Sequence, residues 1–229
     1  MDTKRIFQRL AENSRSVEQG VVQAERAHKE AIRSNHRPAI DLQARVHMLL
    51  VGLMAEARLR RTLFDPAGFN SLERSLIMHD PSQLGRWKAA VTYSFRRHYV
   101  IPVHLDVATV LTSPGREQYL TLIATLDHDL KPIIEDRNKA AHAQWEWLMN
   151  SHETDVTGRA ARPMNYLQIH RRGLIIHLMD DLVHTLAVSE PTFQRDFDST
   201  YGRLQTLRAG LSGRDYRSWA STLHPHPHV

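Results

Sequence analysis

The sequence predicts an all-α protein, an up-and-down bundle of helices, on two observations. Apolar residues recur at spacings of three and four along nearly all of the 229 residues, which is the period of one helix face. No segment shows sustained alternation of apolar and polar residues, so we expect no strand. Proline and glycine interrupt the pattern where helices are expected to end. We therefore predict a single all-α domain over residues 1–211 and a weakly structured tail over residues 212–229.

The bundle is predicted to begin with a long helix over residues 3–34. It is highly charged and carries only a thin apolar stripe, and we consider it a candidate arm for dimerisation. Pro38 is expected to end the turn that follows. A strongly amphipathic helix then runs to Phe64 and is stopped by Pro66 and Gly68. We expect this second helix at the centre of the bundle.

The remaining helices are predicted from the caps and breaks that bound them. A polar loop is expected over residues 151–163. The predicted helices are Ser71–His79 with Ser71 as its cap, a helix opened by Asp80-Pro81 that runs through Tyr99, a helix over about 116–149 that Pro132 kinks or restarts, a helix over Tyr166–Val188, and an extra C-terminal helix from Pro191 to about Leu211.

Composition excludes several classes of site. The chain contains no cysteine, which excludes disulfides, thiolate zinc sites, iron–sulfur clusters and a cysteine nucleophile. The sequence patterns of P-loop, dinucleotide-binding, zincin and α/β-hydrolase proteins are also missing. The opening segment is polar, and no apolar run approaches the roughly 18 residues of a membrane span. We therefore expect a cytoplasmic protein with no membrane contact and no cofactor.

The charge of the chain is basic and rich in arginine. Its 30 basic and 25 acidic residues give a net charge of +5, and 25 of the basic residues are arginine. Guanidinium groups bind phosphate bidentately and stack on bases, which favours nucleic acid as a partner. A GC-rich genome is the alternative source of the arginines. Residues 1–120 carry a net charge of +6, so an RNA site in the second half requires the fold to bring that charge there.

The strongest functional signal is an arginine followed by a polar residue and, after three more residues, by a histidine. Residues 135–142 read Glu-Asp-Arg-Asn-Lys-Ala-Ala-His. With 25 arginines and 15 histidines in the chain, chance gives the bare spacing about 1.6 times, and it occurs three times. Requiring Asn, Asp or His after the arginine lowers the chance count to about 0.25, and only Arg137-Asn138 meets that requirement.

This segment resembles the signature of the HEPN superfamily, an Arg, a polar residue and a His on a helix of a small all-α bundle. The resemblance covers about residues 40–190 and leaves the first helix and the tail outside it. It implies a HEPN-like bundle, a homodimer, and a metal-independent endoribonuclease of phage defence or of a toxin system. An antitoxin or a regulatory RNA or protein is a further partner of such systems. The chain has Gln144 where the adenylylated HEPN toxins carry a tyrosine, so we expect no control by adenylylation there.

Helical geometry and the chemistry of RNA cleavage suggest roles for these residues. Asn138 and His142 are expected on one helix face, whereas Arg137 and His142 point about 140° apart, so the twofold pairing that the resemblance implies would complete the site. We assign His142 to acid/base catalysis, Arg137 to stabilising the phosphorane charge, and Asn138 to orienting His142 or the phosphate. Three further cations are candidate contacts to RNA phosphates: Lys139, Arg171 and Arg172.

Two other interpretations of these residues stay open. In the first, Arg137 pairs with a nearby acid across a helical turn and His142 is an ordinary surface residue. The protein is then a non-catalytic helical module that binds RNA or protein. In the second, the residues His177, Asp181 and His184 of one helix ligate a metal with carboxylates from another helix. The Glu-x-x-His pairs of di-metal carboxylate bundles are missing from the sequence, so the site prediction includes no metal.

Histidines repeat every seven residues along the helix Tyr166–Val188. His170, His177 and His184 therefore stay on one face. We expect this stripe to form either a polar seam between helices or a wall of the groove that holds His142. The tail contains His224, His226 and His228 between prolines, and we regard that pattern as adventitious.

Overall fold

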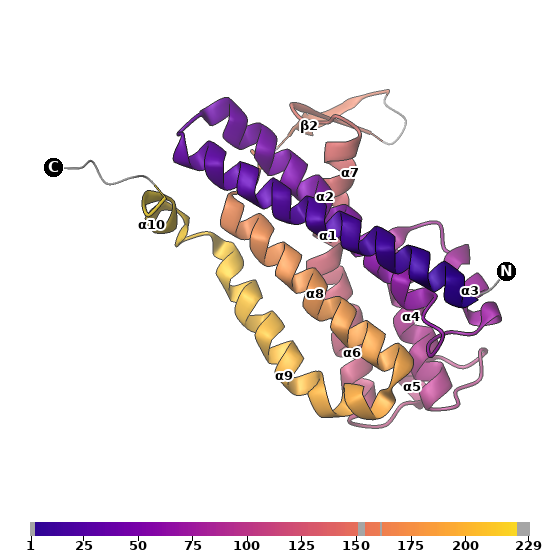
Figure 1. Ribbon diagram of the computed structural model, residues 1–229. Helices are drawn as coiled ribbons and strands as arrows, with labels where there is room; N and C mark the ends of the chain where they lie inside the picture. The colour runs from indigo at the N-terminus through magenta and orange to yellow at the C-terminus, as the bar shows by residue number, and fades with distance from the viewer. Residues whose placement is uncertain (1–2, 151–153, 161, 224–229) are drawn as a thin grey trace.

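The computed structural model describes residues 3–150, 154–160 and 162–223. These residues form an all-α bundle, as predicted, with one short hairpin at its edge (Figure 1). None of the described helices is long and apolar enough to cross a membrane. Most of the buried apolar side chains form one continuous cluster that reaches from Val21 in the first helix to Leu204 in α9 (Glu190–Ala209).

The first two helices form an antiparallel pair along one side of the bundle (Figure 1). They are α1 (Thr3–Arg33) and α2 (Arg37–Leu63). Pro38 was predicted to end the turn before this helix, but it lies in the first turn of α2. A proline is tolerated there because the N–H groups of the first turn have no acceptor within the helix. The predicted narrow stripe of α1 does pack against the bundle, with Val21 and Ala24 among its buried residues.

Three helices follow, of which the first has the predicted bounds and the second starts later than predicted. They are α3 (Ser71–His79), α4 (Gln83–His98) and α5 (Val107–Val110). The cap of α3 is Asn70 and not Ser71, because Asn70 and Glu73 form a capping box. Ser82, whose hydroxyl accepts from the Gly85 N–H, caps α4, which therefore starts after Asp80-Pro81.

The helix predicted over 116–149 is broken and is shorter than predicted. It consists of α6 (Gly115–Thr125), a π-helical turn (Leu126–Leu130) and α7 (Lys131–Ala141). The wide turn precedes Pro132, where an ordinary α-helical hydrogen bond is impossible. The helix ends at Ala141 because Ala143 adopts a left-handed conformation with φ of 54°, which turns the chain away from the helix axis.

The predictions of no strand and of a loop over 151–163 are wrong in part. An antiparallel hairpin joins β1 (Trp147–Met149) to β2 (Val156–Arg159) beside the end of α7 (Figure 1). Strands of three and four residues are too short to show a period of two in the sequence, and a register shift between Leu148 and Met149 disrupts the alternation further.

The last helices are α8 (Tyr166–Val188), α9 (Glu190–Ala209) and α10 (Tyr216–Ser221), with a 3₁₀ turn at Gly210–Ser212. Within the tail predicted to be weakly structured, residues 216–221 thus form a helix. Trp219 anchors it, because its ring stacks on the buried Tyr166 at a centroid distance of 4.8 Å. His224, His226 and His228 lie outside the described residues.

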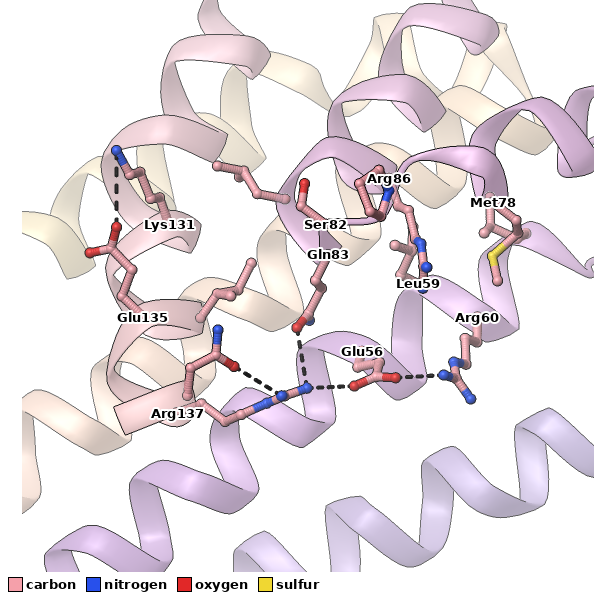
Figure 2. A pocket seen from close by; sticks show the side chains of 15 residues that line it. Glu56, Leu59, Arg60, Met78, Ser82, Gln83, Arg86, Lys131, Glu135 and Arg137 are labelled. Atoms are coloured by element: carbon pink, nitrogen blue, oxygen red, sulfur yellow. Dashed lines mark hydrogen bonds and ion pairs between the residues drawn. The ribbon is translucent and has the colours of Figure 1, made fainter. Parts of the chain in front are cut away.

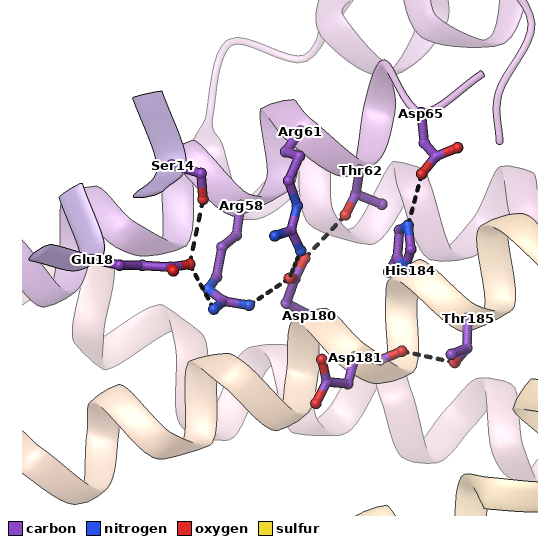
Figure 3. Close-up of polar contacts among 10 residues, drawn as sticks. All are labelled: Ser14, Glu18, Arg58, Arg61, Thr62, Asp65, Asp180, Asp181, His184 and Thr185. Atoms are coloured by element: carbon purple, nitrogen blue, oxygen red, sulfur yellow. Dashed lines mark hydrogen bonds and ion pairs between the residues drawn. The ribbon is translucent and has the colours of Figure 1, made fainter. Parts of the chain in front are cut away.

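Asp180 joins α8 to α2 in the interior (Figure 3). Its fully buried carboxylate accepts hydrogen bonds from Arg58 at 2.8 Å, Arg61 at 2.7 Å and Thr62 at 3.0 Å. Arg58 also pairs with Glu18 of α1 at 2.6 Å. A buried charge is tolerated only when it is paired and hydrogen-bonded, so this network fixes how the three helices dock together.

Candidate functional site

Helix α7 carries the Arg137-Asn138 pair and packs directly on α2 at Gly52. A Cβ built on Gly52 would lie 2.5 Å from Arg137 Cγ and closer still to Arg137 Cβ. Only a residue without a side chain fits under Arg137. Gly52 thus lets α7 approach α2 closely and sets the depth at which the Arg137 guanidinium lies.

The guanidinium of Arg137 is held by groups from three helices (Figure 2). Its Nη2 donates to Glu56 of α2 at 2.5 Å and to Gln83 of α4 at 3.4 Å. Its Nη1 donates to the amide oxygen of Asn138 at 3.0 Å. The buried Nε of Arg137 has no hydrogen-bond partner among the described residues. The side chain is therefore fixed in place and keeps N–H donors unused.

A pocket of about 460 Å³ opens beside Arg137 and Asn138. It lies between α2, α7 and the first turn of α4 (Figure 2). Its lining includes four cations against two carboxylates, Glu56 and Glu135. The cations are Arg60, Arg86, Lys131 and Arg137.

Glu56 links two of these cations by pairing with Arg60 at 2.6 Å as well as with Arg137. The Nε of Arg86 donates to a backbone carbonyl, that of Asp80, at 2.8 Å. The pocket therefore keeps an excess of positive charge that suits a phosphate group. Arg60 and Arg86 come from the basic first half of the chain, so the fold does bring that charge to the Arg137 motif.

His142 lies outside this pocket. It is the first residue beyond α7, and its N–H donates to the Asn138 carbonyl at 3.0 Å. Its side chain is exposed and has no hydrogen-bond or ionic partner within the described ranges. Within one chain, therefore, Arg137 is held in the pocket, whereas His142 lies outside it at the exposed end of the helix. The predicted continuation of the helix to about residue 149, which would have placed His142 inside it, is missing.

The three cations proposed to bind RNA lie in different places. Lys139 lines a second pocket on the other side of α7 and lies 3.7 Å from Asp136. Arg172 of α8 pairs with the same Asp136 at 2.8 Å. Arg171 bonds to the Gly210 carbonyl and pairs with Asp215, which ties the C-terminal segment to α8. Lys139 and Arg172 are thus close to the end of α7, whereas Arg171 lies on another face.

The histidine stripe of α8 forms a polar seam with the neighbouring elements. His170 Nδ1 lies 2.6 Å from Glu25 of α1, and His184 Nε2 lies 2.9 Å from Asp65 after α2 (Figure 3). Burial, followed by the positive charge of Arg58, lowers the pKa of His177. His170 and His184 reach different partners, and in the described part of the chain no three metal-ligating side chains converge.

Two features of the site were missed from the sequence. Gly52 is an ordinary glycine within a helical pattern, and Arg60, Arg86 and Lys131 are scattered cations until the helices pack. A spacing signal was available for Glu56 and Arg60, which are i,i+4 neighbours. The open interpretation that pairs Arg137 with an acid is correct in kind, but the acid is on α2 and not one turn away on α7.

Comparisons with protein families, with curated proteins and with solved structures return no match for this chain. The family resemblance therefore depends on residues 137–142 and on the helical setting in which they lie.

Proposed function

We propose that this protein is a metal-independent endoribonuclease that acts as a homodimer. The observation that carries the proposal is the position of Arg137 in the wall of a cationic pocket, where one N–H of its Nη1 is unused. An arginine fork held by a carboxylate and an amide is pre-organised to bind a phosphate whose charge increases during reaction. The pocket volume and the excess of cations over carboxylates support the same ligand class.

The reaction requires no metal ion. A base removes the proton from the ribose 2′-hydroxyl, the resulting oxygen attacks the adjacent phosphorus, and the 5′-oxygen leaves with a proton. The products are a 2′,3′-cyclic phosphate and a 5′-hydroxyl. We assign the proton transfers to His142, stabilisation of the phosphorane to Arg137, and orientation of the phosphate to Asn138.

The separation of His142 from the Arg137 pocket supports a site shared by two copies. His142 is exposed at the end of α7 and points to no partner among the described residues of its own chain. A twofold axis near this end would place one copy's His142 against the partner copy's motif, since equal surfaces meet in such dimers. By the family resemblance, the biological setting is phage defence or a toxin system.

A second candidate is a non-catalytic RNA-binding module. The pairing of Arg137 with Glu56 at 2.5 Å favours it, because a guanidinium held by a carboxylate has a smaller net charge for a phosphate. In this alternative the pocket and the end of α7 hold RNA without cleaving it.

Single substitutions at the motif separate the two candidates. In EDTA, His142→Ala and Arg137→Ala are expected to lower RNA cleavage at least 100-fold, and Arg137→Lys is expected to recover little because it lacks the fork. His79→Ala is the matched control, since His79 is exposed on α3 and follows Arg74 at the same spacing. Cleavage that survives both alanine variants, in proteins that melt like the wild type, would contradict the proposal.

A further inference from the structure

Two tryptophans are exposed beside the end of α7. Trp145 lies in the turn after the helix and is 38% exposed, and Trp147 begins β1 and is 56% exposed. Trp87, by contrast, is fully buried in the core. Large aromatic rings normally bury most of their area. Trp145 and Trp147 keep accessible ring area within three residues of each other and so form an exposed aromatic surface beside α7.

An arginine lies over each of these rings. The Arg45 guanidinium is 5.1 Å from the Trp145 ring centroid, and the Arg159 guanidinium is 5.6 Å from that of Trp147. Arg45 also donates to the Trp145 carbonyl at 2.9 Å, and Trp145 Nε1 donates to the Ala140 carbonyl at 3.0 Å. Trp147 and Arg159 are register partners in the hairpin. The rings and cations are therefore held in place before any ligand arrives, which lowers the entropic cost of binding.

A pocket of about 260 Å³ lies between the hairpin, α2 and α7. Its apolar lining includes Met48, Leu148 and Met164. Its charged lining is four cations against the single carboxylate of Asp136, a net charge of +3, and Asp136 is itself paired with Arg172. The four cations are Arg45, Lys139, Arg159 and Arg162.

We call this area the tryptophan surface and define it by Trp145, Trp147, Arg45, Arg159 and the pocket beside them. We propose that the tryptophan surface binds unpaired bases of single-stranded RNA. An exposed indole offers a face for a base, and the neighbouring cations offer partners for the phosphates on either side of it. A duplex hides the faces of its bases, so it cannot use the rings. An apolar protein segment would leave the +3 charge without a counterpart.

The position of the tryptophan surface relates it to the proposed cleavage site. Lys139 and Trp145 line its pocket on either side of His142 in the sequence. A strand held there passes the end of α7 where His142 is exposed. The inference depends on the proposed function for its choice of RNA, and it adds that the substrate is single-stranded at the point of contact.

Binding is tested apart from cleavage by using the full-length His142→Ala protein. A fluorescently labelled oligoadenylate of about 12 nucleotides is titrated with protein, and anisotropy gives the dissociation constant. Trp147→Ala is expected to weaken binding about tenfold, and Arg159→Ala is expected to reduce the slope of log K against log salt by about 1. Arg203→Ala is the control for loss of one positive charge, since Arg203 is exposed on α9, a helix that lies apart from the hairpin (Figure 1).

An abasic oligonucleotide of the same length separates base stacking from phosphate binding. It keeps the phosphates and lacks the bases, so Trp147→Ala should leave its affinity unchanged. A blunt RNA duplex should bind the His142→Ala protein and its Trp147→Ala derivative equally. The inference is overturned if Trp147→Ala binds oligoadenylate as tightly as its parent, or if it weakens binding of the abasic strand by the same factor.

The outcomes for the two proposals are distinct. If the wild type cleaves RNA and Trp147→Ala changes neither oligoadenylate affinity nor the KM of cleavage, the proposed binding of RNA by the tryptophan surface is refuted and the nuclease proposal stands. If oligoadenylate binding depends on Trp147 but the wild type never cleaves, the surface is supported and the nuclease proposal falls.

Discussion

Arg137 lies directly over Gly52, with no room between them for a methyl group. This contact is what seats α7 on α2 and places the guanidinium within reach of Glu56, one helical turn after Gly52. The geometry of the candidate site therefore depends on a residue that has no functional group. The site is built by backbone packing first and by polar contacts second.

Gly52→Ala is expected to destabilise the protein and to lower its activity. Because the new Cβ collides with the stem of Arg137, α7 must shift, which costs about 1–3 kcal/mol of unfolding free energy. We expect RNA cleavage to fall at least tenfold as the guanidinium leaves its partners. Gly202→Ala on α9 is the matched control, since nothing lies within 4 Å of its added Cβ, and it should stabilise by roughly 0.5–1 kcal/mol. Equal stability of both variants, measured by urea denaturation, would refute the packing argument.

Asp180→Ala is expected to be among the most destabilising single substitutions in the chain. It leaves the 6%-exposed Arg58 without its interior partner, a change that costs about 3–5 kcal/mol when a buried ion pair loses one member. Asp181→Ala, at the exposed neighbouring position, should change the free energy of unfolding by no more than about 0.5 kcal/mol. Chemical denaturation of the two variants side by side is the measurement, and similar midpoints would count against the Asp180 network.

The stability of the protein is expected to fall below about pH 6.5. Burial lowers the pKa of His28 to about 4 and, together with the charge of His28, lowers that of His47 to about 4. Both side chains are fully buried beside Tyr166, and none of their ring nitrogens has a hydrogen-bond partner among the described residues. Between pH 6.5 and 4 the unfolded chain takes up protons that the folded chain does not. The free energy of unfolding therefore decreases as the pH is lowered, by up to about 1.4 kcal/mol per pH unit for each histidine.

Replacing His28 by leucine tests the source of this dependence. His28→Leu removes no hydrogen bond and takes one of the two histidines out of the titration, so the slope between pH 6.5 and 4 should be about halved. His104→Leu, at an exposed position, is expected to leave the slope unchanged. A wild-type free energy of unfolding that stays level from pH 7 to pH 4.5 would contradict this account.

Glu56→Gln is expected to weaken cleavage more than stability. The amide keeps the shape of the side chain but removes the charge that holds Arg137 and Arg60, so the guanidinium loses its fixed orientation. We expect at least a tenfold loss of cleavage and about 1 kcal/mol of stability. Glu30→Gln, which removes the carboxylate of an exposed pair with Arg33 on α1, should change neither. A Glu56→Gln protein with full activity would show that this ion pair does not position Arg137.

The sequence was sufficient for the features set by local periodicity. It predicted the bundle, the long first helix and the bounds of α8, because each depends on a repeating apolar face. The early end of α7 could not be predicted, since it follows from the left-handed conformation of Ala143, a residue that usually continues helices. The hairpin was missed because its strands are too short to alternate, and α10 was missed because it depends on Trp219 reaching Tyr166 from 53 residues along the chain.

The candidate site was predicted only as far as its linear motif. The pairing of Arg137 with Glu56 joins residues 81 positions apart, and the cationic pocket draws Arg60, Arg86 and Lys131 from three helices. Such a grouping is created by tertiary packing and has no period in the sequence. The helix geometry predicted that Arg137 and His142 diverge, and the structure places them in a pocket and at a free helix end respectively.

The role of the ribose 2′-hydroxyl is the most direct test of the nuclease proposal. Wild-type protein is incubated in EDTA with a single-stranded RNA and with the same sequence carrying 2′-O-methyl groups throughout, and the products are resolved on a denaturing gel. We predict cleavage of the unmodified RNA alone, with 2′,3′-cyclic phosphate ends and with loss of activity in His142→Ala. Cleavage of the methylated strand, or an intact RNA after incubation with folded dimeric protein, would contradict the account.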